Sequence, residues 1–125
     1  MTQDEILKLP LNKLPKACAE MMNLKYHDPG DTYFYVDFNY ASEPYYERFA
    51  PQSSLDDARY VACFVVNVMS ERTGIDAETI RFRIYKALQL VMNKEEEDGR
   101  SWNLLFHKPA ELTRACLLTW YGSVK

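Results

Sequence analysis

The chain has 125 residues, 47% of them hydrophobic and 14% aromatic, and its 15 Lys and Arg against 18 Asp and Glu give a net charge of −3. This length suits a single domain that buries its own core without disulfides or metals, and the apolar content excludes a disordered segment. The acidic balance argues against general binding of nucleic acids, because that binding depends mainly on neutralising phosphates.

The three cysteines, Cys18, Cys63 and Cys116, lie far apart in apolar helical patterns. We therefore expect buried, reduced core thiols and no disulfide framework. Residues 1–11 are polar and lack the basic and apolar regions of a secretion signal. The most apolar stretch, residues 61–69, is about half of the roughly 20 residues that a membrane span needs. These features predict a cytoplasmic protein without a membrane segment.

The first predicted element is a short amphipathic helix over residues 11–22. Asn12 is its expected N-cap, and Pro15 is tolerated only because it falls in the opening turn. The side chains with helical spacing are Leu14, Ala17, Cys18 and Met21.

A strand is predicted next, over residues 32–40, after the turn composition of residues 27–31. One face would carry Phe34, Val36, Phe38 and Tyr40, and the other Tyr33, Tyr35, Asp37 and Asn39. Residues 41–53 mix serine, proline and aromatic side chains, a composition that predicts a packed loop.

The clearest predicted element is a helix over residues 55–72. Ser54 followed by Asp57 resembles a capping box, and Gly74 stands where a left-handed C-terminal cap would fall. The apolar stripe of this helix comprises Ala58, Val61, Ala62, Val65, Val68 and Met69.

Residues 80–92 have an ambiguous pattern, because Ile80, Phe82 and Ile84 alternate as in a strand. The helical alternative rests on the spacing of Ile84, Ala87, Leu88 and Val91. We favour the strand. It would turn through the acidic residues 95–99 and return as residues 101–106 in an antiparallel hairpin.

A last helix is predicted over residues 110–121, with Pro109 at its first position and Gly122 after it. Its inner stripe would be Leu112, Ala115, Cys116 and Thr119. The elements together predict an α+β fold, in which a small antiparallel sheet is layered between helices as an α/β/α sandwich.

Three local strings share features with one known family. They are Ala19 to Met22 in the first helix, the turn and helix start from Pro51 to Ala58, and the tryptophan-bearing segment from Trp102 to Phe106 followed by Pro109 to Leu118. In these strings, which cover about half of the chain, the sequence resembles the phage ABA sandwich domain family. The resemblance implies a sheet layered between helices, a phage origin and production in the bacterial cytoplasm, and it brings no catalytic residues.

The departures from that family lie at residues 28–52, which form a tyrosine-rich insertion, and at residues 86–99, which are longer than usual. Added segments on a shared fold are where specificity is expected. The resemblance therefore directs attention to the aromatic stretch.

No catalytic, metal or cofactor signature is present in the sequence. His27 and His107 are the only histidines, and neither has the spacing of a zinc site. Cys116 with His107 could form a thiol and base pair, but the position of Cys116 on an apolar stripe favours a core thiol. We expect a protein that is not an enzyme and has no cofactor.

Aromatic side chains crowd the stretch from residue 33 to residue 49, next to Arg48. They are Tyr33, Phe34, Tyr35, Phe38, Tyr40, Tyr45, Tyr46 and Phe49. The rings could belong to the core or to a self-association surface. They could also form a ligand pocket, since rings stack on nucleobases and arginine binds phosphate.

Arg81 and Arg83 would share one face of the strand predicted at 80–92, where they would either be solvated or line a cleft with Arg48. Trp102 would either pack in the core or be a strong stacking partner. A ligand site would then comprise Tyr35, Tyr45, Tyr46, Arg48, Arg81, Arg83 and Trp102.

The functional hypothesis is a phage protein that counters bacterial defence by binding and sequestering a nucleotide-derived immune signal in the host cytoplasm. Tight stoichiometric binding would suit a homo-oligomer with pockets between subunits. One alternative is an inhibitor that docks the same aromatic patch on a host or defence protein. Another is a structural or accessory protein of the phage.

Overall fold

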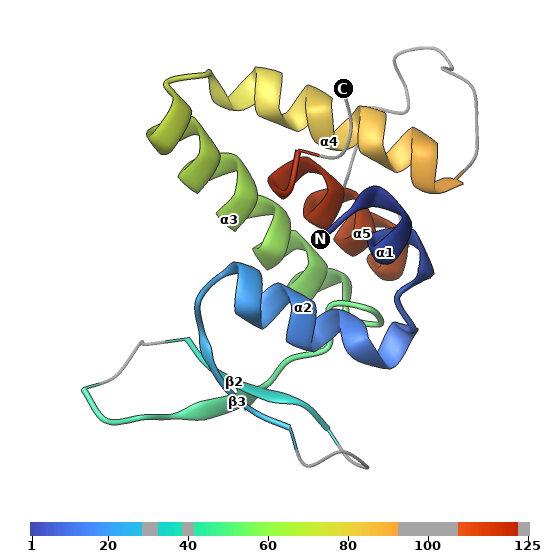
Figure 1. Cartoon of the computed structure of the whole chain (residues 1–125). Helices are drawn as coiled ribbons and strands as arrows, with labels where there is room; N and C mark the ends of the chain where they lie inside the picture. The colour runs from blue at the N-terminus through green and yellow to red at the C-terminus, as the bar shows by residue number, and fades with distance from the viewer. Residues whose placement is uncertain (29–32, 39–41, 93–107, 123–125) are drawn as a thin grey trace.

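The computed structural model describes residues 1–28, 33–38, 42–92 and 108–122. Its helices are α1 (Gln3–Lys8), the 3₁₀ turn η1 (Leu11–Lys13), α2 (Leu14–Met21), α3 (Leu55–Thr73), α4 (Ala77–Met92) and α5 (Pro109–Trp120). Its strands are β1 (Lys25–His27), β2 (Tyr35–Asp37) and β3 (Tyr46–Arg48). Figure 1 shows the strands beside α2 at one end of the molecule and α4 at the other, with α5 between them.

The predicted α+β class is confirmed: a small antiparallel sheet of order β1-β2-β3 packs against helices. The described part of the predicted strand at 32–40 contains β2, which is its central element. Its partner β3 lies inside residues 41–53, so the prediction of a loop without regular structure was wrong there. A strand of three residues is too short to produce an alternation that can be recognised within a mixed composition.

The first helix is confirmed as α2, and the residues before it form η1. Asn12 is not its cap: Lys13 occupies that position and makes no side-chain capping bond, because η1 runs directly into α2. The sequence analysis missed α1, whose start is marked by the Thr2 hydroxyl accepting from the Glu5 amide at 3.2 Å.

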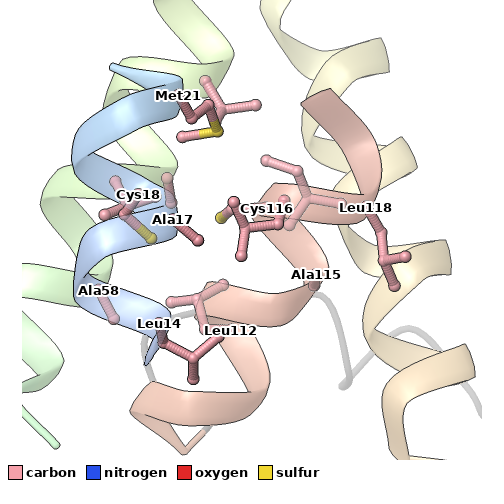
Figure 2. Close-up of a cluster of buried hydrophobic side chains, with 14 of the residues drawn as sticks. Leu14, Ala17, Cys18, Met21, Ala58, Leu112, Ala115, Cys116 and Leu118 are labelled. Carbon is pink, nitrogen blue, oxygen red and sulfur yellow. The ribbon is translucent and has the colours of Figure 1, made fainter. Parts of the chain in front are cut away.

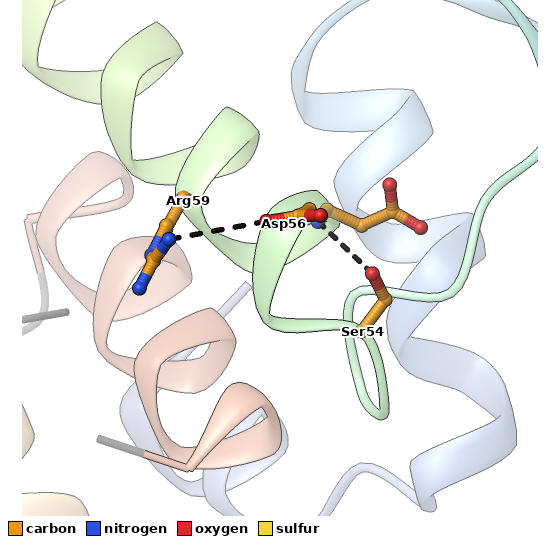
Figure 3. Close-up of polar contacts among 4 residues, drawn as sticks. Ser54, Asp56 and Arg59 are labelled. Atoms are coloured by element: carbon orange, nitrogen blue, oxygen red, sulfur yellow. Dashed lines mark hydrogen bonds and ion pairs between the residues drawn. The ribbon is translucent and has the colours of Figure 1, made fainter. Parts of the chain in front are cut away.

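Helix α3 begins and ends as predicted. The Ser54 hydroxyl accepts from the Asp57 amide at 3.3 Å (Figure 3). Gly74 ends the helix in the left-handed conformation, with φ of 73°. The Asp57 carboxylate accepts from the Ala50 amide at 2.8 Å instead of completing a reciprocal capping box. That contact fixes the end of the β3 segment to the start of α3. The pair of Arg59 with Asp56, at 3.9 Å, is exposed and adds little stability.

The predicted strand at 80–92 was wrong, because these residues belong to α4. The Asp76 carboxylate accepts from the Thr79 amide at 2.7 Å and caps the helix, a signal that the sequence analysis overlooked. The side chains that α4 buries follow helical spacing; they are Ile80, Ile84, Tyr85, Ala87 and Leu88. The return strand predicted at 101–106 lies outside the described residues.

Helix α5 is the centre of the core and packs against α1, α2, α3 and α4. It confirms the predicted last helix from Pro109, and its stripe is buried as expected. Figure 2 shows side chains of α2, α3 and α5 meeting in one cluster; they include Leu14, Cys18, Ala58, Leu112, Cys116 and Leu118. Cys18 and Cys116 are buried as predicted, whereas Cys63 is exposed because it lies off the apolar stripe of α3.

The guanidinium of Arg114 on α5 holds the N-terminal segment. It donates to the carbonyl oxygens of Ile6 at 2.7 Å, Leu7 at 3.5 Å and Leu9 at 2.6 Å. Carbonyls at the end of a helix lack intrahelical partners, so these bonds satisfy the end of α1. None of the helices in the described part of the chain combines the length and apolarity that crossing a membrane requires.

Candidate functional site: the outer face of the sheet

The register of the sheet sorts its side chains into two faces. Val36 at the centre of β2 is fully buried in the main core, so its face points toward the helices. The opposite face, here called the outer face, carries Tyr35 directly across from Arg48 and Asp37 directly across from Tyr46. Residues that lie opposite each other in an antiparallel pair share a face, so the predicted Tyr35, Tyr46 and Arg48 come together there.

The phenylalanines of the aromatic stretch point inward. Phe49 is 1% exposed, and the Phe38 ring makes edge contacts with the rings of Phe49, at 5.8 Å, and of Tyr60 on α3, at 4.9 Å. Phe34 also packs against the core. For these rings, the interpretation as core residues is the correct one.

Among the described tyrosines of the same stretch, Tyr35 is half-buried and three are at the surface. Tyr40 lies outside the described residues. Tyr33 is 54% exposed, Tyr46 is 42% exposed, and Tyr45, just before β3, is 65% exposed. A hydroxyl group makes tyrosine tolerable at such half-wet positions, whereas phenylalanine gains most from full burial. The aromatic stretch thus divides by residue type into core rings and surface rings.

Arg48 is positioned by an aromatic neighbour. Its guanidinium carbon lies 3.5 Å from the centre of the Tyr33 ring, which is close stacking of a cation on a π face. The contact orders a long and otherwise adaptable side chain at the edge of the sheet. Arg48 therefore presents its donors from a defined place.

A cavity of about 250 Å³ opens beside this stacked pair. Its lining comes from η1 and the start of α2, the residue after β1, the two residues before β2, the end of β3 and the turn before α3. The polar and aromatic residues that line it include Lys13, Asp28, Tyr33, Arg48, Gln52 and Ser53. Lys13 and Arg48 supply positive charge, and Asp28 supplies one carboxylate.

Gln52 in the cavity wall has an unusual environment. Its Oε1 atom is shielded from solvent and accepts no hydrogen bond from the described residues. A buried acceptor without a donor is unfavourable, and native structures retain few of them. A donor from a bound molecule would satisfy this acceptor once the Gln52 amide turned its oxygen toward the cavity.

The other predicted site residues do not join this site. Arg81 and Arg83 lie on α4, at the opposite end of the molecule from the sheet (Figure 1), so the cleft predicted between them and Arg48 does not exist. The strand prediction placed them on one face, but on a helix two positions apart they diverge. Trp102 lies outside the described residues.

Sequence analysis missed Lys13, Asp28 and Gln52. They come from three separate segments that only the fold brings together, and none of them belongs to a motif. The turn composition around Asp28 was the one available signal, because loops beside a sheet often carry binding residues.

The described residues hold no group of three His, Cys, Asp or Glu side chains that could bind a metal ion. Cys116, once considered as a nucleophile, is buried, and burial raises the pKa of its thiol well above the usual value. Burial also raises the pKa of Cys18. Thiols in this state are poor nucleophiles, since the thiolate is the reactive form.

We expect one thiol per chain to react in the folded protein. Iodoacetamide should modify Cys63 within minutes while Cys18 and Cys116 react only after denaturation, because their sulfur atoms are inaccessible and protonated. Intact-mass spectrometry would count the adducts. Cys63→Ser should remove the fast adduct, and fast labelling at Cys116 would contradict the packing of α5.

Comparison of the chain with protein-family models, with curated proteins and with solved structures finds no match. The resemblance to the phage ABA sandwich family accordingly stays a prediction.

Proposed function

We propose that this protein is a non-enzymatic binding protein, and that its outer face and the adjoining cavity take up a nucleotide-like ligand. The observation that carries the proposal is the stacked pair of Arg48 and Tyr33 in the lining of a cavity. An ordered guanidinium can bind a phosphate with two parallel hydrogen bonds. Exposed rings beside it offer surfaces on which a nucleobase can stack.

The position of the rings supports this assignment. Tyr33 borders the cavity, while Tyr35 and Tyr46 lie on the same face of the sheet as Arg48. Stacking of one base contributes about 1–3 kcal/mol of binding free energy. A ligand that also binds Arg48 through a phosphate gains the free energy of that contact as well. Such a surface recognises a small anionic aromatic molecule without needing the broad positive field that a polymer requires.

The biological role that we propose is sequestration. A phage protein of this kind would bind a nucleotide-derived signal of bacterial defence, such as a cyclic nucleotide or an ADP-ribose-like messenger, in the host cytoplasm. The phage context rests on the family resemblance, and the ligand class rests on the outer face. Stoichiometric capture needs nanomolar affinity, about 12 kcal/mol, and a homo-oligomer that closes the site with a second copy would help to supply it.

Isothermal titration with ADP-ribose and with cyclic dinucleotides tests the proposal. Wild-type protein should bind at least one of them, and Arg48→Ala should weaken that binding by roughly 10- to 100-fold, as loss of a charged phosphate contact predicts. Tyr46→Ala should weaken it by about tenfold through lost stacking.

Arg81→Ala is the matched control, because Arg81 is also an exposed arginine and lies on α4, at the other end of the molecule from the sheet (Figure 1). Its affinity should equal that of wild type. Absence of binding heat across the whole ligand class, or equal losses in Arg48→Ala and Arg81→Ala, would overturn the proposed function.

A protein partner is the second candidate, and the exposed Tyr45 favours it. Tyr45 and Tyr46 lie outside the cavity lining and are 65% and 42% exposed, an arrangement typical of residues that anchor protein interfaces. Pull-down from bacterial lysate with wild type and with Tyr45→Ala would identify a partner that depends on this side chain. Capture that is unchanged by Tyr45→Ala would exclude this surface as the anchor.

A further inference from the structure

The charges around the cavity are mixed, and this mixture carries information about the ligand. Lys13 lines the cavity from the end of η1, and Arg48 lines it from the end of β3. Asp28 lines it from the position after β1. A simple anion such as phosphate would be attracted by the cations and repelled by Asp28. A ligand that carries both an anionic group and hydroxyl donors would meet both demands.

A second acceptor in the lining of the cavity is Gln52, which comes from the turn before α3. Its Oε1 atom lacks a hydrogen-bond partner within the described part of the chain. Rotation about the last side-chain bond is soft, so the amide can turn its oxygen toward the cavity. Asp28 and Gln52 then form a pair of acceptors, and an acidic side chain that accepts from a sugar hydroxyl is a common way to bind ribose.

The size of the cavity limits what can enter. At about 250 Å³ it is smaller than the roughly 300–1,000 Å³ of pockets that enclose whole drug-sized ligands. A phosphorylated pentose is of suitable size, whereas a base attached to it would have to stay outside. Tyr33 is half exposed and lines the cavity, so its ring is available to a base that stays outside.

We propose that the cavity binds the sugar-phosphate end of its ligand, with the phosphate on Arg48 and Lys13 and the sugar hydroxyls on Asp28 and Gln52. This inference deepens the proposed function and rests on it for the location of the site. In this arrangement the sugar is bound inside the cavity, and the base contacts only the exposed rings.

The test uses the folded full chain and four probes: inorganic phosphate, ribose 5-phosphate, adenosine and AMP. Ribose 5-phosphate should bind at least tenfold more tightly than phosphate, and AMP should bind more tightly again. Gln52→Leu, which keeps the size of the side chain but removes the acceptor, should weaken ribose 5-phosphate by about tenfold and leave phosphate unchanged.

The same variant reports on folding. Because Gln52→Leu removes a buried acceptor that has no partner, its Tm should equal or exceed that of wild type, so a loss of affinity cannot come from unfolding. Arg81→Ala serves again as the surface control. Equal affinity for phosphate and ribose 5-phosphate, or no effect of Gln52→Leu on ribose 5-phosphate, would overturn the assignment of the sugar.

The outcomes separate this inference from the proposed function. If AMP binds through Arg48 but ribose 5-phosphate does not bind, the nucleotide site stands and the sugar assignment fails. If ribose 5-phosphate binds as tightly as AMP, the sugar-phosphate assignment stands and recognition of a base fails. If none of the four probes binds, both are overturned.

Discussion

Replacing Leu117 with alanine is expected to lower the free energy of unfolding by about 3 kcal/mol, within the roughly 2–5 kcal/mol range of buried leucine truncations. Leu117 has no exposed surface, and it lies on α5, the helix that contacts α1, α2, α3 and α4. The surrounding helices all pack against α5, so they cannot easily move inward to fill the cavity that the smaller side chain leaves. Urea unfolding followed by circular dichroism would measure the change in midpoint at constant slope.

Leu90→Ala is the matched control for that substitution. Leu90 on α4 is 40% exposed, and alanine suits a helix as well as leucine does. The expected change is within about 0.5 kcal/mol, as for most surface positions. Similar losses for Leu117→Ala and Leu90→Ala would show that α5 is not the centre of the core.

Arg114→Ala is expected to destabilise the fold by about 2–3 kcal/mol and to release the N-terminal segment. Hydrogen bonds from a charged group contribute about 1.5–3 kcal/mol, and the substitution removes every donor that Arg114 gives to Ile6, Leu7 and Leu9. Hydrogen exchange should show faster loss of protection in α1 than in α3. That regional difference distinguishes release of a segment from general destabilisation.

Two further variants sharpen this result. Arg114→Lys keeps the charge but replaces a planar fork with a single ammonium, so we expect an intermediate loss of stability. Arg83→Ala removes an exposed arginine from α4 and should leave stability unchanged. If Arg114→Ala left exchange in residues 3–8 unaltered, the guanidinium would not be what holds α1 in place.

The helices could be predicted where two independent signals agreed. For α3 the apolar stripe, the Ser54 cap and Gly74 all pointed to the same boundaries, and the structure has them. At α4 the apolar pattern fitted two periods, and the alternation of Ile80, Phe82 and Ile84 favoured the wrong one. The cap at Asp76, which settles the helix, lies outside the ambiguous stretch.

Only the site residues on the strands could be predicted, because their placement follows from the alternation of side chains along a strand. Tyr35 and Arg48 were identified because a strand places every second side chain on one face. The cavity depends on which segments the helices bring beside the sheet, and sequence spacing contains no such information. Lys13 and Gln52 are 39 positions apart along the chain, and each is unremarkable in its own segment.

The division of phenylalanine and tyrosine between the two faces of one short sheet has an evolutionary consequence. The rings that point to the helices belong to the core, so we expect the fold to persist when the exposed Tyr33 and Tyr46 are exchanged. Descendants of such a protein could follow a changing target by altering these few positions. The same separation makes the sheet a natural scaffold for selecting new recognition surfaces from a randomised library.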